Sequence, residues 1–437
     1  MVLRSQRTGA GESSDELPGP ESTARRVAYE VVLRVFQDEA YADRVFRSAA
    51  SGLPARDRAF AMELAYGTVR QVRLLDHAIE TIGRRPVRKL DPPVRAALRL
   101  GAYQLGFMSG VPDHAAGNES VELVRSAGLQ RAVGFTNAVM RRLTNELRQL
   151  LSDLPDRTAS DAALRHSYPD WIAETWWGEL GPEEARELMV AQNGPAETVV
   201  RINRRIESSE LDIEPLVGRS DPAFPDALLV DRVPERWLEH GLAWPQSRGS
   251  QLAAMCVGSQ PSDRVLDLCA APGGKATQLA GDVVAVELDK GRARQLEEMA
   301  RRHRATNVRV VNADARALPD ELAGFDRVLL DAPCSGLGVL ASRPDLRWRA
   351  KPLPELQLEL LRVALERVRP GGTVTYSVCT MSKAETLDVI DEVGAPLDDL
   401  GSIYPQFRHP GRARCLLTLP HRHRTSGFFI ARLRREP

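Results

Sequence analysis

Short apolar runs that alternate with helical stretches are the feature that most restricts the fold of this chain. The runs are residues 265–268, 283–286, 308–311, 328–330 and 374–376, and helices are predicted from Ala276 and over residues 292–304. Strands that alternate with helices favour a mostly parallel sheet with helices on both faces. Ligands of such sheets bind at the carboxyl ends of the strands. We therefore predict an α/β, doubly wound, Rossmann-like domain over residues 251–437.

Residues 22–148 have a helical periodicity instead. Apolar residues recur at helical spacing in successive stretches, namely Ala28, Val31, Val32, Val35 and Phe36, then Leu74, Leu75, Ala78, Ile79 and Ile82, and last Phe135, Ala138, Val139 and Leu143. Asp91 followed by Pro92 marks a further helix start, as a cap and a first-turn proline. No strand-like alternation interrupts these stretches, so an all-α domain is predicted.

Residues 149–250 differ in composition from both of these regions. Five of the six tryptophans lie here, with many prolines and one strand-like run at residues 198–203. Aromatic side chains among arginines can stack on RNA bases, although tryptophans more often anchor a core. We predict a small α+β connector, for which an RNA-facing surface is one of the two interpretations.

Composition narrows the class of protein. A chain of 437 residues with 43% hydrophobic and 27% charged residues is globular and long enough for several domains. It has no run of about 18 apolar residues, and residues 1–21 lack the apolar core of a signal peptide and are predicted to be a disordered tail. The five cysteines have no CxxC spacing, which favours neither a disulfide framework nor a zinc site. We expect a cytoplasmic monomer that binds no membrane and no metal.

The net charge of zero hides an uneven distribution. Residues 23–148 contain 20 Lys and Arg against 13 Asp and Glu, which leaves a positive excess there and an equal negative excess elsewhere. Arg84, Arg85, Arg88 and Lys89 form a cluster within this part. A local basic excess suits phosphate binding, and a solvated helical face is the competing explanation.

A glycine-containing loop follows the first predicted strand. It consists of Cys269, Ala270, Ala271, Pro272, Gly273, Gly274 and Lys275. Glycines there let a ligand approach the backbone, and a following helix would offer free N–H groups. The loop has neither the G-x-G-x-x-G spacing of dinucleotide sites nor the spacing of a P-loop. The sequence therefore predicts a different nucleotide site.

Carboxylates follow the next two strands. Glu287 ends the second run, where an acidic residue suits a ribose diol. Asp314 follows the third, where it can accept a hydrogen bond from an adenine amino group or simply cap a helix. Acidic residues at successive strand ends favour a nucleoside ligand.

Two cysteines follow the last two strands. The fourth run leads through Asp331 to Cys334, and the fifth leads to Cys379. We interpret the other three cysteines, Cys256, Cys269 and Cys415, as small buried residues. Two thiols at the ends of neighbouring strands instead favour a nucleophilic role.

These motifs together resemble one enzyme family. DLCAAPGGK, LLDAPCSGLG and YSVCT, in that order, resemble the Sun-type (RsmB-like) RNA cytosine-5 methyltransferases. ELAYGTVR, ALRLGAYQL, VPDHAAGNESVEL and GFTNAVMRRL resemble the NusB-like RNA-binding domain of that family, and the likeness spans residues 23–434. It implies that S-adenosyl-L-methionine binds to residues 269–275, Glu287, Asp314 and Asp331. It also implies that Cys379 is the nucleophile, that Cys334 assists product release, and that the substrate is RNA, with small-subunit rRNA expected.

The chemistry explains why two thiols would be required. Carbon 5 of cytosine is a weak nucleophile, and addition of a thiolate at carbon 6 makes it an enamine carbon. A base, Cys334 or a nearby water, must then remove the carbon-5 proton. Asp331 is expected to hydrogen-bond the cytosine as charge develops there. Lys275, one of only five lysines, is expected to help place the base.

Other functions remain as alternatives. The chain departs from the family pattern at Val378, at residues 384–386 and at residues 245–250, so the target nucleotide stays open. Methylation of tRNA, another RNA or DNA is one alternative, and a non-catalytic RNA-binding factor is another. The two thiols disfavour both the non-catalytic factor and a protein-directed methyltransferase. The missing dinucleotide fingerprint disfavours a dehydrogenase.

Overall fold

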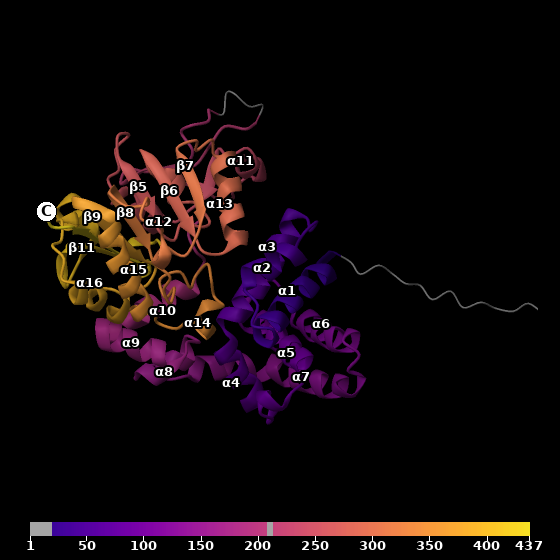
Figure 1. Ribbon diagram of the computed structural model, residues 1–437. Coiled ribbons are helices and arrows are strands. Elements are labelled where there is room, and N and C mark those ends of the chain that lie inside the picture. Colours follow the sequence, from indigo (N-terminus) through magenta and orange to yellow (C-terminus); the bar gives the residue numbers. More distant parts are fainter. Residues whose placement is uncertain (1–19, 208–212) are drawn as a thin grey trace, which may run out of the picture. The chain divides into compact units, whose positions relative to one another are not determined.

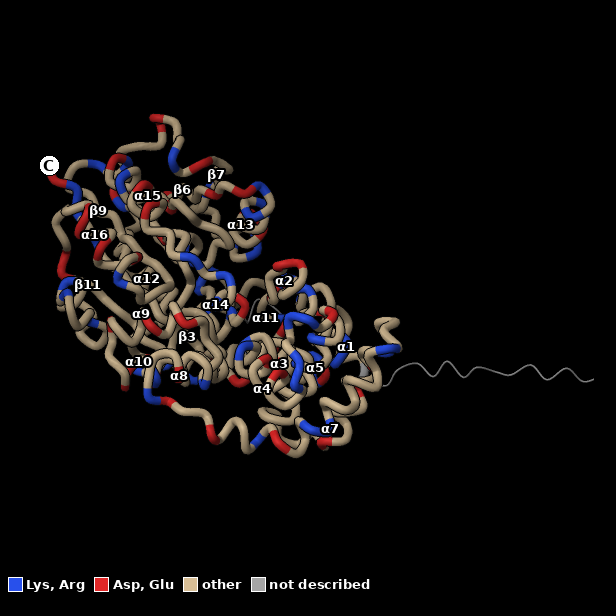
Figure 2. Tube along the Cα trace, turned by 90° about the horizontal axis from the view of Figure 1, so that it is seen from below, with Lys and Arg blue, Asp and Glu red and all other residues tan. Residues whose placement is uncertain are grey.

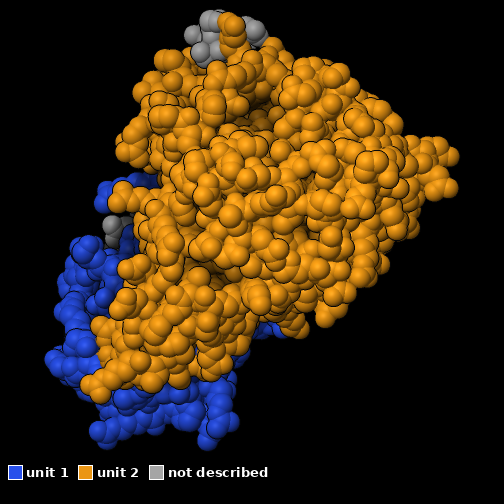
Figure 3. Space-filling model, turned by 90° about the vertical axis from the view of Figure 1, so that its left-hand side faces the viewer, with its two compact units in different colours: residues 1–153 blue, residues 154–437 orange. Residues whose placement is uncertain are grey.

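The computed structural model describes residues 20–207 and 213–437, and the chain divides into two compact units, residues 1–153 and 154–437 (Figures 1 and 3). The predicted disordered tail lies outside the described residues except for its last two, which begin the first helix. Among the described residues, no helix combines the length and the apolar content that a bilayer crossing requires.

The first unit is helical throughout its described part, as predicted. Its helices are α1 (Pro20–Gln37), α2 (Ala42–Ala49), α3 (Ala55–Arg70), α4 (Val72–Gly83), α5 (Pro92–Phe107), α6 (Asp113–Ser126) and α7 (Gln130–Asp153), with a 3-10 turn, η1 (Val87–Lys89). Helix α5 is central and packs against α1, α3, α4, α6 and α7. Its side chains Val94, Leu98 and Leu105 are buried and form the apolar face of the helix.

Two details of this unit differ from prediction. Ala138 is exposed, because the buried face of α7 follows Thr136, Val139 and Leu143 instead. Asp91 precedes α5 as predicted, but its side chain makes no capping hydrogen bond. Proline occupies the first turn of α5, so one N–H group that a cap would satisfy is missing there.

The second unit contains an eight-stranded sheet with the order β10-β11-β12-β9-β8-β5-β6-β7 (Figure 1). The five predicted strands are β5 (Arg264–Asp267), β6 (Asp282–Glu287), β7 (Val308–Asn312), β8 (Phe325–Asp331) and β9 (Val368–Val378), and neighbours among them are parallel. Strands β10 (Arg408–His409), β11 (Arg412–Thr418) and β12 (Phe428–Arg434) extend the sheet in antiparallel fashion. The predicted Rossmann-like class is therefore confirmed.

Both faces of this sheet are covered. Leu266 and Val328 pack toward α15 (Pro354–Arg367), whereas their neighbours Val265 and Leu329 pack toward Ala254 of α12 (Arg248–Met255). Alternate residues of a strand point to opposite faces, which explains why these strands are apolar throughout. The remaining elements of the unit's second half are α13 (Lys290–Arg302), α14 (Leu346–Arg349), α16 (Leu387–Val393), α17 (Leu400–Ile403), α18 (Pro420–His423), η4 (Ala315–Ala317), η5 (Lys383–Glu385) and η6 (Pro405–Phe407).

The helix predicted from Ala276 is wrong. Only a single 3-10 turn, η3 (Ala276–Gln278), follows the glycine loop, and β6 already begins at Asp282. Gly281 turns the chain with a φ of 85°, so too few residues remain for an α-helix. No α-helix N-terminus therefore offers N–H groups to a ligand at this loop.

Residues 154–245 join the sheet domain in one compact unit. They form α8 (Ala159–Arg165), α9 (Asp170–Leu180), α10 (Pro182–Asn193), α11 (Glu235–Glu239) and a four-stranded antiparallel sheet of β2 (Arg219–Asp221), β3 (Phe224–Leu229), β1 (Val199–Ile202) and β4 (Ala243–Pro245). The predicted strand at residues 198–203 is β1. Trp176 and Trp237 are buried, as core anchors are. The predicted boundary at residue 148 falls inside α7, and the division at residue 250 stays a prediction.

Candidate active site

The carboxyl ends of the parallel strands carry the predicted site residues. Because β5, β6, β7, β8 and β9 are parallel neighbours, the loops that follow them lie along one edge of the sheet. These loops are residues 268–275, 287–289, 312–314, 331–338 and 379–382.

The structure brings the two predicted thiols together. The Cys334 Sγ and Cys379 Sγ atoms are 3.2 Å apart. The pairing of β8 with β9 continues into the loops, since Ala332 N donates to Ser377 O at 2.9 Å. Gly338 N also donates to Cys379 O at 2.9 Å. Backbone hydrogen bonds therefore fix the separation of the two sulfur atoms.

The surroundings of Cys334 disfavour its ionisation. The hydrogen bond with Cys379, together with burial and the charge of that neighbour, raises the pKa of Cys334 well above its usual value. Cys334 is therefore a neutral thiol at neutral pH, placed to donate to the sulfur of Cys379. Burial raises the pKa of Cys256 and of Cys269, and raises that of Cys415 to about 12. The thiols outside the pair therefore stay protonated.

Lys275 and Asp331 form an ion pair beside the thiols. Lys275 Nζ lies 2.6 Å from Asp331 Oδ2, and Ser377 Oγ donates to Asp331 Oδ1 at 2.7 Å. Burial by itself would lower the pKa of Lys275, but the adjacent Asp331 carboxylate outweighs it and the pKa is raised. The ammonium group also lies 5.2 Å from the centre of the Phe428 ring. Lys275 therefore stays charged although most of its side chain is buried.

Glu385 is a site residue that the sequence interpretation missed. Its side chain is fully buried, and its Oε1 accepts hydrogen bonds from Ser335 N at 2.9 Å, Leu353 N at 3.1 Å and Gln357 Nε2 at 2.9 Å. Its Oε2 accepts from Ser335 Oγ. The carboxylate thus ties the loop of Cys334 to the start of α15. One sequence gives no sign that a glutamate six residues after Cys379 is buried.

Two cavities meet at the glycine loop. The larger, about 470 Å³, is lined by Lys275, Asp331 and Cys379 and is called the thiol pocket here. Trp244 and Phe428 also line it, whereas Cys334 lies behind Cys379. The smaller, about 320 Å³, is called the carboxylate pocket and is lined by Glu287, Asp314, Arg292, Leu288, Leu356 and Leu360 among others. Cys269 lines both cavities.

Glu287 and Asp314 have different surroundings in the carboxylate pocket. Glu287 is buried, and its Oε1 accepts from Asp289 N at 2.9 Å. Asp314 instead caps η4 and pairs with Arg316, with 2.7 Å between Oδ2 and Nη2. The hydrogen bonds from Arg316 lower the pKa of Asp314 to about 2. Asp314 is thus both a pocket residue and the cap that its position after a strand suggested.

The glycine loop is fixed in its path. Gly273 has a φ of 110°, and a Cβ atom there would lie 2.5 Å from Leu296 Cδ1, so only glycine fits. Arg201 of β1 donates from Nη2 to Gly274 O at 3.2 Å and to Thr277 Oγ1 at 2.7 Å. Burial lowers the pKa of Arg201 to about 10. The connector therefore holds the loop from outside the parallel sheet.

The residues present fit a cofactor with a nucleoside part. The carboxylate pocket offers acceptor oxygens for ribose hydroxyls and leucine side chains for a base, and it shares Cys269 with the thiol pocket. Over residues 20–207 and 213–437, no group of His, Cys, Asp or Glu is arranged as a metal site.

Comparison with known families agrees with both units. A family model described as 16S rRNA methyltransferase RsmB/F matches residues 254–434, and a NusB family model matches residues 22–145. A putative methyltransferase of Mycobacterium tuberculosis is 35% identical over 95% of this chain and 97% of its own. The ribosomal RNA small subunit methyltransferase B of Thermus thermophilus is 34% identical over 94% of this chain and 98% of its own.

Solved structures share the fold. The crystal structure of PH0851 matches with a TM-score of 0.78 at 24% identity and covers 97% of this chain and 99% of its own. NSun6 from Pyrococcus horikoshii, solved with SFG, matches with a TM-score of 0.55 at 25% identity and covers 62% of this chain and 99% of its own. The resemblance inferred from the motifs is confirmed. This chain belongs to the RsmB/F family of S-adenosylmethionine-dependent RNA methyltransferases and carries the NusB domain as well.

Proposed function

We propose that this protein methylates carbon 5 of a cytosine in small-subunit ribosomal RNA through a covalent cysteine adduct. The observation that carries the proposal is the pair of thiols 3.2 Å apart beside an ion-paired lysine and aspartate. Methylation of a ring nitrogen or a ribose oxygen has a ready nucleophile, whereas carbon 5 has to be activated by addition at carbon 6. The Thermus thermophilus relative, named for small-subunit rRNA, supports the choice of RNA.

The cofactor would occupy the carboxylate pocket and reach the thiol pocket past Cys269. Glu287 would accept hydrogen bonds from ribose hydroxyls, Asp314 would face the adenine, and residues 269–275 would surround the amino-acid part, with Asp331 at the far end. S-adenosyl-L-methionine supplies an electrophilic methyl group when it is bound there.

Cys379 would act as the nucleophile. After its proton passes to solvent, its thiolate forms a bond to carbon 6 of the cytosine, and the electron pair of the carbon 5–carbon 6 double bond becomes available at carbon 5. Cys334 supports the thiolate beforehand, because a neutral thiol at 3.2 Å can donate a hydrogen bond to it. The raised pKa of Cys334 supports this order of roles.

Asp331 and Lys275 would hold the base. The Asp331 carboxylate is oriented by Lys275 and Ser377, one on each oxygen. It can accept a hydrogen bond from the cytosine amino group as the ring gains negative character. Lys275, which the pair keeps charged, then lies close enough to stabilise that character.

Product release would fall to Cys334. A base has to take the carbon-5 proton, after which the carbon 6–sulfur bond breaks and its electron pair returns to Cys379. The hydrogen bond with Cys379 and the charge of Cys379 both help to raise the pKa of Cys334. Both effects disappear once Cys379 is a neutral thioether. Cys334 would therefore ionise more readily at the stage that needs a base, and its thiolate, or a water beside it, would then accept the carbon-5 proton.

RNA would also contact the NusB-like unit. Arg84, Arg85, Arg88 and Lys89 are exposed there, and none of them has a carboxylate partner among the described residues. The Arg85 guanidinium instead lies over the Phe135 ring at 5.4 Å. Figure 2 shows further basic positions spread over several helices of this unit among acidic ones. We expect the cluster to contact phosphates, and we expect a monomer.

A denaturing gel with labelled small-subunit rRNA transcript and S-adenosylmethionine tests the proposal. Cys334→Ala should form the carbon 6–sulfur bond but fail at release, so a protein–RNA adduct should survive denaturation. Cys379→Ala and the double variant should give no adduct, and all three should lose turnover. Cys415→Ala serves as the control, because that thiol is buried in the core and should leave turnover unchanged.

The pattern of adducts decides between interpretations. An adduct with Cys379→Ala but not with Cys334→Ala would show exchanged roles. No adduct in any variant, with methylation intact, would contradict a thiol mechanism. Bisulfite sequencing of rRNA from a deletion strain would identify the target nucleotide as the one that is no longer methylated. If every 5-methylcytosine of the small-subunit rRNA were still present in that strain, the proposed substrate would be ruled out.

A further inference from the structure

A long groove adjoins the thiol pocket. It measures about 960 Å³ and shares Ala196, Glu197, Val339, Ser342 and Ser426 with that pocket. Its walls come from the end of α10 and the segment after it, from the neighbourhood of β2 and β3, and from α18 with the segment after it. Because the two share walls, a ligand chain that enters the thiol pocket can continue into the groove.

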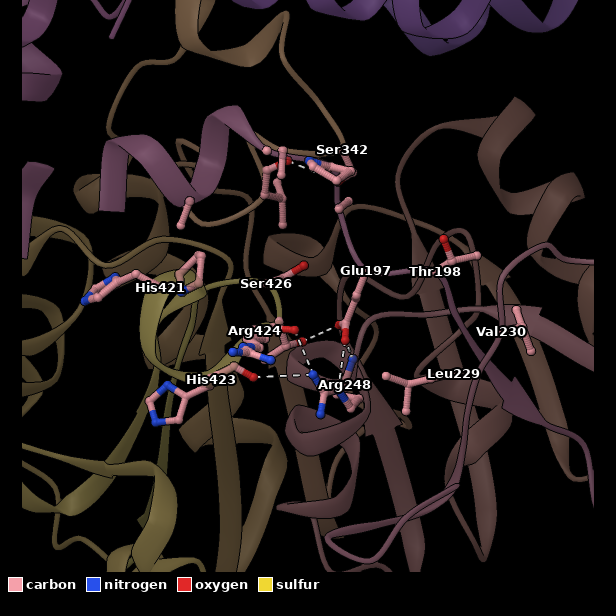
Figure 4. A pocket seen from close by; sticks show the side chains of 18 of the residues that line it. Glu197, Thr198, Leu229, Val230, Arg248, Ser342, His421, His423, Arg424 and Ser426 are labelled. Atoms are coloured by element: carbon pink, nitrogen blue, oxygen red, sulfur yellow. Dashed lines mark hydrogen bonds and ion pairs between the residues drawn. The ribbon is translucent and has the colours of Figure 1, made fainter. Parts of the chain in front are cut away.

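The floor of this groove is a closed network of charges. Arg248 pairs with Glu197 at 2.8 Å and with Asp221 at 2.6 Å, and it also donates to the carbonyl oxygens of His423 and Arg424. Figure 4 shows His423 and Arg424 on one side of the Arg248–Glu197 pair and Leu229 and Val230 on the other. Each charged group of the floor therefore has an ion-pair partner, with two carboxylates sharing one guanidinium.

Two arginines on the walls are not compensated. Arg219 and Arg424 are exposed, and their guanidinium groups have no hydrogen-bond or ion-pair partner among the described residues. The backbone of Arg424 is nevertheless fixed, since its carbonyl accepts from Arg248 Nη2 at 2.7 Å. Arg219 lies in β2, where it pairs with Leu229 of β3, so each arginine presents a free charge from an anchored position, which suits a phosphate.

The walls also present exposed apolar side chains. Val190 is 56% exposed and Val217 is 71% exposed, and they come from different wall segments. Free cations combined with exposed apolar surface fit a single nucleic-acid strand, whose phosphates and bases need different partners. A cytosine can reach Cys379 only when it is unpaired or turned out of a helix, and an unpaired target continues from the pocket as a single strand.

We propose that this groove binds the single-stranded RNA directly next to the target cytosine, with Arg219 and Arg424 on phosphates and Val190 and Val217 against bases. The proposal rests on the proposed function, because the strand is the continuation of the nucleotide held in the thiol pocket. An extended peptide is the competing occupant, and the test separates the two.

The test compares short RNA oligonucleotides by fluorescence anisotropy. One presents the cytosine alone, and the other two extend it by about six nucleotides on the 5′ side or on the 3′ side. This length lies within the range of single-strand binding sites. One of the two extensions should tighten binding to the natural protein by about tenfold. The double variant Arg219→Gln/Arg424→Gln should lose that gain, and the slope of log affinity against log salt should fall by about 1.4 for two lost phosphate contacts.

Controls keep the result specific. Arg294→Gln changes an exposed arginine on α13 that also lacks a partner among the described residues, and it should bind all three oligonucleotides as the natural protein does. All three substituted side chains are exposed, so thermal melting should show the fold unchanged. A photoreactive nucleotide in the extension should crosslink to the segment around Val190 or Val217.

The outcomes are separable from those of the proposed function. The proposal would be overturned if the double variant bound the extended oligonucleotide as tightly as the natural protein does. Crosslinks outside the groove would also overturn it. A groove that binds a peptide instead predicts both results. Binding and crosslinking need no methyl transfer, so loss of 5-methylcytosine formation would count against the proposed function alone.

Discussion

The two halves of the parallel edge are built differently. At β8 and β9 the polar side chains bond to one another across loops, as Lys275 does with Asp331 and Glu385 does with Ser335. At β6 and β7 the acidic residues bond to their own loops, Glu287 to the N–H of Asp289 and Asp314 to Arg316. In the half at β8 and β9, polar interactions join different segments of the chain. In the half at β6 and β7, each acidic side chain bonds within its own loop, beside an open cavity.

This difference matches two physical tasks. A site for bond formation gains from donors and acceptors that are already oriented, because nothing must reorganise when charge develops. A site for a dissociable cofactor has to present acceptors that can exchange a local partner for a ligand. We therefore expect substitutions in the β8 and β9 half to affect turnover, and substitutions in the β6 and β7 half to affect cofactor affinity.

Asp331→Asn should have the largest effect. The amide cannot balance the charge of Lys275, whose side chain is only 13% exposed, and it offers cytosine a weaker acceptor. We expect the single-turnover rate at saturating S-adenosylmethionine to fall by about 10²- to 10³-fold. Asp320→Asn, at a fully exposed aspartate, is the control and should leave the rate unchanged. A rate within threefold of the natural protein would remove Asp331 from the reaction.

Glu385→Gln should affect both stability and release. The amide turns one acceptor into a donor that faces Ser335, whose hydroxyl and N–H both need an acceptor. The free energy of unfolding should fall by about 1–3 kcal/mol in a urea titration. The loop of Cys334 should also loosen, so an adduct should accumulate on a denaturing gel.

The exposed Glu392→Gln is the matched control for Glu385, since Glu392 makes only a 3.5 Å contact with Arg362. Its unfolding free energy and its gel pattern should both be unchanged. A Glu385→Gln protein that is destabilised but releases product normally would limit Glu385 to a purely structural role.

Glu287→Ala should weaken S-adenosylmethionine binding with little effect on turnover at saturation. The loss should be about 1–3 kcal/mol, as for a hydrogen bond to a charged group, and calorimetry measures it directly. Unchanged affinity would exclude Glu287 from the cofactor site. Reduced turnover at saturating cofactor would contradict the division of tasks between the two halves.

Asp314→Asn should have the smallest effect, below about 1 kcal/mol in the same calorimetric measurement, because Arg316 already engages both of its oxygens. Its asparagine can still cap η4. An effect as large as that of Glu287→Ala would mean that the bond to Arg316 is given up on binding.

Local patterns predicted most of what the sheet shows. The five apolar runs became β5 to β9, because buried parallel strands are apolar on both faces. The cysteines at their ends proved to be adjacent, because strand order follows from the Rossmann-like class. Both inferences needed only residues close together in sequence and a general rule of topology.

The features that were predicted wrongly or not at all depend on residues that lie further away in the sequence. Ala276 starts a turn rather than a helix, because β6 and Gly281 follow too soon. Glu385 gained its importance from Leu353 and Gln357, which lie about 30 residues away and are brought near by α15. The connector sheet, apart from β1, was missed because strands such as β2 are short and exposed.

The contact of Arg201 with the glycine loop limits how much of the N-terminal part of the chain can be removed without disturbing the site. A fragment that begins where the RsmB/F match begins, at residue 254, would contain every proposed catalytic side chain. It would nevertheless leave Gly274 O without its long-range donor and would remove Trp244 from the thiol pocket. We therefore expect the smallest fragment that keeps this site intact to begin near residue 154, about a hundred residues before the RsmB/F match begins.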